Sequence, residues 1–347
     1  MSMKAKILEL LREKKDRVAA GAPESEAYVS GQELCEQFGV SRTAVWKAIG
    51  QLKKEGYVIE AVQNRGYRLL DQTEEVYNQA DIQSRLKTKW VAHPLQFFDS
   101  IDSTNIRAKL EAEQGAESGL LVVSDMQSAG RGRRGRGWES PAGTNIYYTL
   151  MLKPDFSSDC APMLTLVMAL AVAKGIRQTL RRDSEEAAAK VGIKWPNDIV
   201  VDGKKVCGIL TEMSMEQGYI QHIVIGVGIN VRKQEFPEEI RDRAAAIDEQ
   251  CGFRISRSQL IADIMEAFEE DYEIFFRTHD LKGLRASYAE LLVNQDREVC
   301  VLDPKGEYRG IARGINDQGE LLVERQDGTV EEVYAGEVSV RGIYGYV

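Results

Sequence analysis

The chain has 347 residues, a formal net charge of −9 with neutral histidines, and a hydrophobic content of 43%. These values predict two or three domains with sizeable cores and argue against a disordered chain. The five cysteines and three histidines are scattered and form no CxxC pair, so neither a disulfide framework nor a zinc site is indicated.

The first 70 residues form a pattern of three helices followed by a hairpin. Residues 4–17 carry leucines at helical spacing, and GQELCEQF and SRTAVWKAIGQLKKEG are two further helical runs joined at Gly39-Val40. Ser41 is placed to cap the third helix. YVIEAVQNRGYRLL then reads as two short strands, with a turn at Asn64-Arg65-Gly66 where Gly66 supplies a positive φ. The order predicts a winged helix-turn-helix over residues 1–70.

Residues 1–70 also carry a net charge of +3, from 12 Lys/Arg against 9 Asp/Glu. A recognition helix and a wing tip would place polar and basic groups against DNA. The residues predicted to face DNA are Ser41, Arg42, Thr43, Trp46, Lys47 and Arg65. The alternative is a small structural domain whose basic helix is merely solvated.

The residue pattern of the rest of the chain changes twice. Residues 71–80 are polar and predict a linker, whereas residues 81–292 mix strands with helices expected at about 104–114, 162–182 and 257–277. A hairpin about Asp202-Gly203 and many short connections indicate an α+β domain with a mixed sheet. Short strand-like runs between turns predict a small SH3-like β-barrel over residues 293–347. The predicted fold class is therefore α+β.

Nothing in the sequence predicts a signal peptide or a membrane span. The N-terminus alternates charges with leucines, and the longest apolar segment, 161–176, is interrupted by Pro162 and Lys174. We therefore expect a soluble cytoplasmic protein that does not contact a membrane.

The segment AGRGRRGRGWESPAGTN, residues 129–145, is a glycine- and arginine-rich loop between predicted strands. Glycine allows close backbone approach, and guanidinium groups suit phosphate or carboxylate oxygens. Three interpretations compete: an RNA-binding segment, a solvated basic loop, and a loop that orders over an anionic ligand with Trp138 as a hydrophobic lid.

Three other motifs carry groups suited to ligand binding. Lys194 ends a strand in KWPND, where its ammonium could neutralise charge on a phosphate or carboxylate if it points into a cleft. Residues 103–105, STN, open a helix and either bind a polar head group or simply cap that helix. GVGIN, residues 226–230, lacks the third glycine of a dinucleotide fingerprint, and no P-loop or GxSxG elbow is present.

Together these motifs resemble those of biotin protein ligases. The set comprises STN (103–105), QSAGRGRRGRGW (127–138), SP (140–141), KWPND (194–198), the GIL-E run from Gly208 to Glu212, and GVGIN (226–230). With the predicted winged helix and barrel, the whole chain looks like the bifunctional bacterial type that also represses the biotin operon.

The resemblance implies that biotin and ATP, with Mg²⁺, form biotinyl-5′-adenylate, which a lysine of a biotin carboxyl carrier domain then attacks. It implies that catalysis depends on Lys194, Arg131 and Arg133. The implied biotin-binding residues are Ser103, Thr104, Asn105, Gln127, Arg131, Gly132, Arg133 and Lys194. The implied adenylate pocket contains Trp138, Asn230 and Gly208, whereas the metal ligands are not marked.

The implied partners are the carrier domain, operator DNA and a second copy of the chain once adenylate is bound. Three alternatives stay open at this stage. One is a DNA-binding regulator that only senses a ligand, another is a lipoate-type ligase, and the third is a biotin ligase without regulatory DNA binding.

Overall fold

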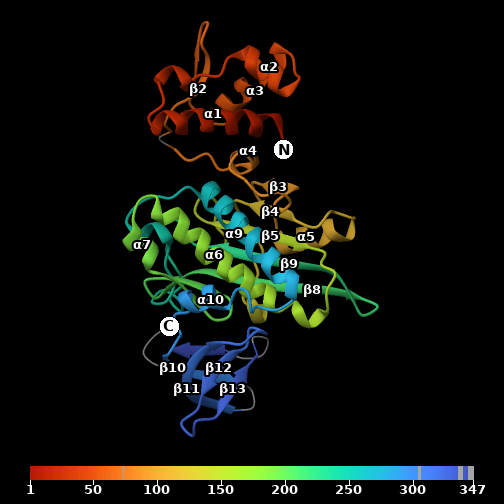
Figure 1. Ribbon diagram of the computed structural model, residues 1–347, viewed down its shortest axis with the longest axis vertical. Helices are drawn as coiled ribbons and strands as arrows, with labels where there is room; N and C mark the ends of the chain where they lie inside the picture. The colour runs from red at the N-terminus through yellow and green to blue at the C-terminus, as the bar shows by residue number, and fades with distance from the viewer. Residues whose placement is uncertain (73, 304–305, 335–338, 343–347) are drawn as a thin grey trace. The chain divides into compact units, whose positions relative to one another are not determined.

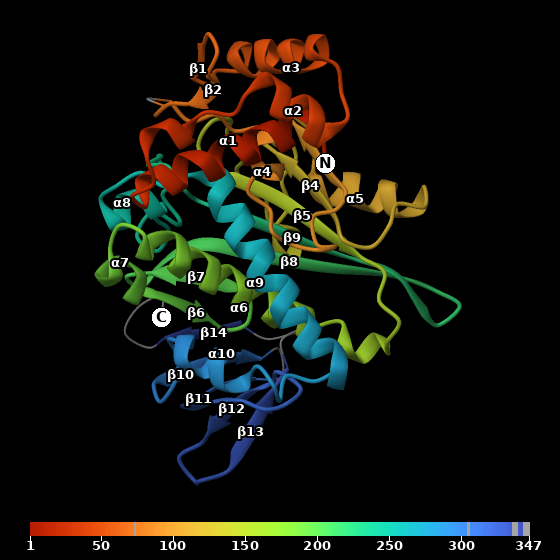
Figure 2. The ribbon, with the colours of Figure 1, turned by 45° about the horizontal axis from the view of Figure 1, so that its top comes forward.

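The computed structural model describes residues 1–72, 74–303, 306–334 and 339–342. The chain divides into two compact units, Met1–Leu86 and Lys87–Val347. Figures 1 and 2 show their elements from two directions.

The first unit is the predicted winged helix-turn-helix. Its elements are α1 (Met3–Ala19), the 3-10 turn η1 (Glu24–Ala27), α2 (Gly31–Phe38), α3 (Arg42–Lys54), β1 (Ile59–Val62), β2 (Gly66–Leu69) and α4 (Gln79–Gln83). Gly39 ends α2 in the left-handed conformation, and Ser41 caps α3 by accepting from the Ala44 amide. Val45, Ile49 and Leu52 are buried, as their spacing predicts.

The wing is an antiparallel pair in which Val62 lies opposite Gly66. Gly66 has a φ of 114°, and a Cβ there would lie 2.1 Å from the Val29 carbonyl oxygen. Only glycine therefore fits the turn. The unit also includes α4, which falls within the segment where the sequence predicted a linker and the start of the next domain.

The second unit contains a seven-stranded mixed sheet in the order β3-β4-β5-β9-β8-β7-β6, in which the β3–β4 pair is parallel. Its strands are β3 (Leu95–Phe98), β4 (Leu120–Ser124), β5 (Ile146–Leu152), β6 (Val191–Lys194), β7 (Asp198–Val201), β8 (Lys204–Glu216) and β9 (Tyr219–Ile229). Asp202 and Gly203 both have positive φ in the predicted β7–β8 turn. The mixed sheet predicted from the sequence is confirmed.

Helices cover this sheet on both faces. The helical elements are α5 (Thr104–Glu113), η2 (Arg133–Gly135), η3 (Ser158–Cys160), α6 (Met163–Arg181), α7 (Glu185–Ala189), α8 (Ile247–Cys251), α9 (Arg257–Thr278) and α10 (Arg285–Leu291). Helices α6 and α9 run side by side (Figures 1 and 2), packed closely at Gly175, where a Cβ would lie 2.8 Å from the Ile264 nitrogen. The short helices α7, α8 and α10 were not predicted.

Strand β5 shows how the two faces divide. Tyr148 donates its hydroxyl to Met168 of α6, whereas the adjacent Thr149 contacts Thr104 and Asn105 of α5. Successive side chains of a strand point to opposite faces, so α5 and α6 lie on opposite sides of the sheet. All seven residues of β5 are buried for the same reason.

Helix α6 and the three-residue turn before it, Ser158–Arg181, are long and apolar enough to cross a bilayer. This helix extends beyond the apolar segment judged too short from the sequence. However, 72% of its apolar stretch is buried inside the fold, as in a core helix.

The end of the chain forms a five-stranded antiparallel sheet in the order β13-β12-β11-β10-β14. Its strands are β10 (Glu298–Asp303), β11 (Gly306–Ile315), β12 (Leu321–Glu324), β13 (Val330–Val333) and β14 (Ser339–Gly342). The Trp195 indole nitrogen donates to the Gly319 carbonyl oxygen at 3.0 Å, which ties this sheet to the KWPND segment. The all-β domain is confirmed, whereas closure of its sheet into a barrel stays a prediction.

Candidate functional site

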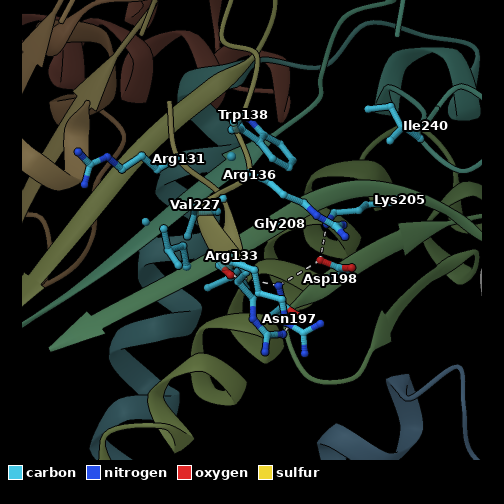
Figure 3. Close-up of a pocket in the computed structure, with 18 of the residues that line it drawn as sticks. Arg131, Arg133, Arg136, Trp138, Asn197, Asp198, Lys205, Gly208, Val227 and Ile240 are labelled. Carbon is cyan, nitrogen blue, oxygen red and sulfur yellow. Dashed lines mark hydrogen bonds and ion pairs between the residues drawn. The ribbon is translucent and has the colours of Figure 1, made fainter. Parts of the chain in front are cut away.

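A cavity of about 770 Å³ lies in the second unit, against the sheet face that α5 covers. Figure 3 shows part of its lining. Every ligase residue predicted from the sequence lines it: Ser103, Thr104, Asn105, Gln127, Arg131, Gly132, Arg133, Trp138, Lys194, Gly208 and Asn230. The fold thus gathers at one site residues spread over more than a third of the chain.

The N-terminal end of α5 forms a neutral, polar part of the cavity. Ser103 occupies the N-cap position of α5, but its side chain makes no capping hydrogen bond. Gln127 caps the helix instead, because its Oε1 accepts from the Thr104 nitrogen at 2.8 Å and hydroxyl at 3.1 Å. Ser103, Thr104 and Asn105 are all buried. This arrangement favours ligand binding over capping alone for STN.

The glycine- and arginine-rich loop is folded back on itself. The Gly132 nitrogen donates to the Arg136 oxygen at 2.8 Å, and the Trp138 nitrogen donates to the Gly130 oxygen at 3.0 Å. Gly135, at the tip, has a φ of 72°. The loop is therefore a small arch along the cavity, in contrast to a disordered RNA-binding tail.

The arginines of this arch lie on different sides of the cavity (Figure 3). Arg133 reaches across to Asn197 and donates to its Oδ1 at 2.7 Å. Burial lowers the pKa of Arg133 from its ordinary value, with Asp198 opposing that shift. A guanidinium group still remains charged at neutral pH.

Trp138 packs on a strip of glycines in β8 and β9. Gly208 and Gly228 are opposite each other in register. A Cβ on Gly228 would lie 2.5 Å from the Trp138 Cε2 atom, and a Cβ on Gly208 would lie 3.0 Å from its Cζ3 atom. The absence of side chains at these positions leaves room for a flat ring on the sheet.

The KWPND segment supplies a buried ammonium and its surroundings. Lys194 ends β6, lines the cavity and is 6% exposed. Asn197 donates to the Ile209 carbonyl oxygen and to Asp198 Oδ1, each at 3.2 Å. Asp198 pairs with Lys205 at 2.6 Å, and the Lys205 Nζ atom lies 5.6 Å from the centre of the Trp138 ring.

The sequence missed several residues of this cavity: Asn197, Asp198, Lys205, Gly226, Gly228, the segment 239–240 and 242–244, and Leu302. Asn197 and Asp198 belong to the KWPND motif, and the two glycines belong to GVGIN. Membership of these motifs was a usable signal. Lys205 and Leu302 carry no such signal, because strand pairing and the docked C-terminal sheet bring them here.

The predicted DNA-facing residues belong to the first unit. Ser41, Arg42, Thr43, Trp46, Lys47 and Arg65 are all exposed. Trp46 is 67% exposed on α3, and Arg65 at the wing lies over the Tyr28 ring at 5.5 Å. An exposed indole beside basic groups is suited to an interface with a partner.

Comparisons with known proteins match three segments of the chain to family models and most of its length to relatives. The Biotin/lipoate A/B protein ligase family matches residues 97–230, an HTH domain matches 24–68, and the Biotin protein ligase C terminal domain matches 296–341. The bifunctional ligase/repressor BirA of Bacillus spizizenii is 37% identical, with 94% of this chain and 98% of that protein covered. The chain belongs to the bifunctional biotin protein ligase family.

A second member of this family, BirA of Escherichia coli K12, is 32% identical over 90% of this chain and 92% of its own. The biotin protein ligase of Aquifex aeolicus, solved with biotin and ATP, matches with a TM-score of 0.60 and 28% identity. That match covers 72% of this chain and 98% of the Aquifex chain. The match to the Bacillus spizizenii protein spans 331 residues, which is more than the second unit, Lys87–Val347, contains. It therefore includes part of the winged-helix unit.

Proposed function

We propose that the chain uses ATP to join biotin to a lysine of a biotin carboxyl carrier domain, through biotinyl-5′-adenylate. The observation that carries this proposal is a cavity with a neutral polar end at α5 and cationic groups at Lys194 and the arginine arch. Biotinyl-5′-adenylate matches these two ends, because it has a neutral ring at one end and an acyl phosphate at the other. Family membership supports the assignment.

The residue roles follow this division. Ser103, Thr104 and Asn105, with Gln127, hold the ring head group. The arch with Arg131, Gly132 and Arg133 closes over the acyl phosphate, and Lys194 contacts the reacting oxygens. The adenylate packs against Trp138, Gly208 and Asn230.

In the first step, a biotin carboxylate oxygen forms a bond to the α-phosphorus of ATP while the bond to pyrophosphate breaks. Both reactants are anions, so fixed positive charges at Lys194 and Arg133 offset their repulsion and position the attack. In the second step, the acceptor amine attacks the acyl carbon, AMP leaves and the nitrogen loses a proton. The closed arch limits hydrolysis of the anhydride by water.

Mg²⁺ enters this scheme bound to the triphosphate, as part of the substrate. Among residues 1–72, 74–303, 306–334 and 339–342, no group of three or more His, Cys, Asp or Glu side chains could hold a metal ion. The described side chains therefore do not fit a metal centre held by protein alone.

The winged helix supports a second role for the same chain. We propose that α3 and the wing bind operator DNA, and that the adenylate-bound chain dimerises so that two units reach half-sites separated by whole helical turns. For both roles we propose a cytoplasmic location.

One assay tests the ligase: release of pyrophosphate with biotin and ATP, followed by transfer of labelled biotin onto a carrier domain. A ligand sensor would release none. Competition between biotin and lipoate distinguishes the two ligase types, to which the same family description applies. Failure of the adenylate-bound protein to bind DNA upstream of biotin genes would leave a ligase without regulatory function.

A further inference from the structure

Glu212 lies behind the neutral end of the cavity and does not line it, yet it contacts a residue that does. Its Oε2 accepts a hydrogen bond from Asn105 Nδ2 at 2.7 Å, and its Oε1 accepts one from Lys109 Nζ at 2.7 Å. Glu212 belongs to β8 and Asn105 to α5, so the hydrogen bond joins the helix to the sheet. The hydrogen bond to Asn105 thus gives Glu212 an indirect route to a ligand in the cavity.

Asn105 is held by two further contacts. Thr149 donates its hydroxyl to Asn105 Oδ1 at 2.6 Å. A Cβ on Gly226 would lie 2.1 Å from the same Oδ1, so the Asn105 side chain rests directly on the glycine backbone. Asn105 is 5% exposed and has little room to rotate.

These contacts fix which end of the amide points where. The oxygen and nitrogen of an asparagine amide have similar shapes, so packing alone does not distinguish the two orientations. A carboxylate accepts hydrogen bonds only, and therefore selects the orientation in which Asn105 Nδ2 faces Glu212. The reverse orientation would place Asn105 Oδ1 against the carboxylate.

The charge of Glu212 is secured by its neighbours. Burial raises the pKa of this carboxyl, but the hydrogen bonds from Asn105 and Lys109 and the positive charges of Lys109 and Arg131 together hold the pKa below its ordinary value. The group is thus ionised at neutral pH and acts as an acceptor only.

We propose that Glu212 is a positioning residue for head-group recognition, which orients the Asn105 amide so that the cavity offers a fixed donor and acceptor pattern to a cyclic urea. Asn105 keeps one N–H and one oxygen lone pair beyond the contacts described. A urea ring carries both N–H donors and a carbonyl acceptor, whereas a dithiolane ring carries neither. The inference rests on the proposed function and assigns this part of its specificity to Glu212.

The test uses the full chain and the variants Glu212→Gln and Thr149→Val. Glutamine can donate as well as accept, so Glu212→Gln removes the selection of one amide orientation. Thr149→Val removes the donor to Asn105 Oδ1, together with the contact to Thr104. We expect the KM for biotin in pyrophosphate release to rise about tenfold, matched by weaker biotin binding in calorimetry. Because the ring is bound equally in the ground and transition states, kcat at saturating biotin and the KM for ATP should stay unchanged.

Lys109→Met is the matched control, because it removes the ion pair but leaves the Glu212–Asn105 hydrogen bond. Its KM for biotin should stay within about twofold of wild type, since a partly exposed ion pair has a small effect. A Glu212→Gln protein whose biotin KM is unchanged would overturn the inference. So would one in which kcat, the KM for ATP and thermal stability all decline together, which indicates a purely structural role.

Calorimetry separates this inference from the proposed function. Wild-type protein that binds biotin but releases no pyrophosphate would refute the ligase, while the Glu212 variants would still test head-group recognition by affinity. Wild-type protein that does not bind biotin would overturn both.

Discussion

The indole of Trp138 packs directly on the backbone of Gly228, with a methyl group built on that glycine lying 2.5 Å from the Cε2 and Nε1 atoms. We therefore expect Gly228→Ala to displace Trp138 and to speed the loss of bound adenylate about tenfold or more. The measurement is the dissociation rate of labelled adenylate. The double variant Gly228→Ala/Trp138→Ala should lose adenylate little faster than Trp138→Ala alone, because both changes act through the indole. Additive effects on the dissociation rate would contradict this steric account.

Lys194→Ala should lower the rate of adenylate formation by roughly 100- to 1,000-fold, the effect of removing one electrostatic contact to a transition state. The side chain lines the cavity at the end of a buried strand. Single-turnover pyrophosphate release measures the rate. Lys204→Ala is the control, because Lys204 is exposed on the neighbouring hairpin; a wild-type rate for Lys194→Ala would remove Lys194 from its proposed role.

Arg133→Ala should loosen retention of the adenylate. Arg133 is held over the cavity by Asn197, and loss of a charge-assisted contact to the phosphate is expected to raise the dissociation rate about tenfold. Premature release would also label bystander proteins with biotin. Retention equal to that of wild type would show that the arch does not hold the acyl phosphate through this arginine.

Arg65→Ala should weaken DNA binding to a similar degree on specific and nonspecific sequences. A wing-tip contact to phosphate carries no base information, so the slope of log affinity against log salt should fall by about 1. Fluorescence anisotropy over a salt series measures both quantities. A change in sequence preference with an unaltered salt slope would instead place Arg65 on base edges.

Asp81→Ala should destabilise the winged-helix unit by about 3 kcal/mol, because it removes the buried carboxylate that pairs with two largely buried guanidinium groups. Asp81 is 2% exposed, pairs with Arg12 and Arg85, and accepts from the Tyr57 hydroxyl at 3.2 Å. Calorimetric unfolding of the full chain should show an earlier transition for this unit. The exposed Lys15–Asp71 pair is the control, since Lys15→Ala should leave the transition in place. An equal response of the two variants would exclude the buried cluster as the cause.

The sequence was informative where structure depends on neighbouring residues. Gly39, Ser41 and the Val45 stripe specify the corner and the third helix locally, and all three have the predicted roles. Long periodic segments also predicted α6 and α9. Helices α7, α8 and α10 have five to seven residues, which is too short for a clear period.

For the site, motifs indicated which residues to consider but not how they are held. The contact between Asn105 and Glu212 joins residues 107 positions apart and depends on how α5 packs on the sheet. The Lys205–Asp198 pair similarly depends on the register of β7 and β8. Register and packing are properties of the assembled sheet, so no local pattern could have indicated these pairs.

Strand β5 has a consequence for how this protein can change. Tyr148 is anchored to the core helix and Thr149 to the ligand side, so inserting or deleting one residue within the strand would exchange the two environments. Length changes should therefore be tolerated only at chain reversals such as Gln217-Gly218. Specificity in this protein is free to evolve by side-chain replacement, whereas the spacing along its central strands is fixed by the core.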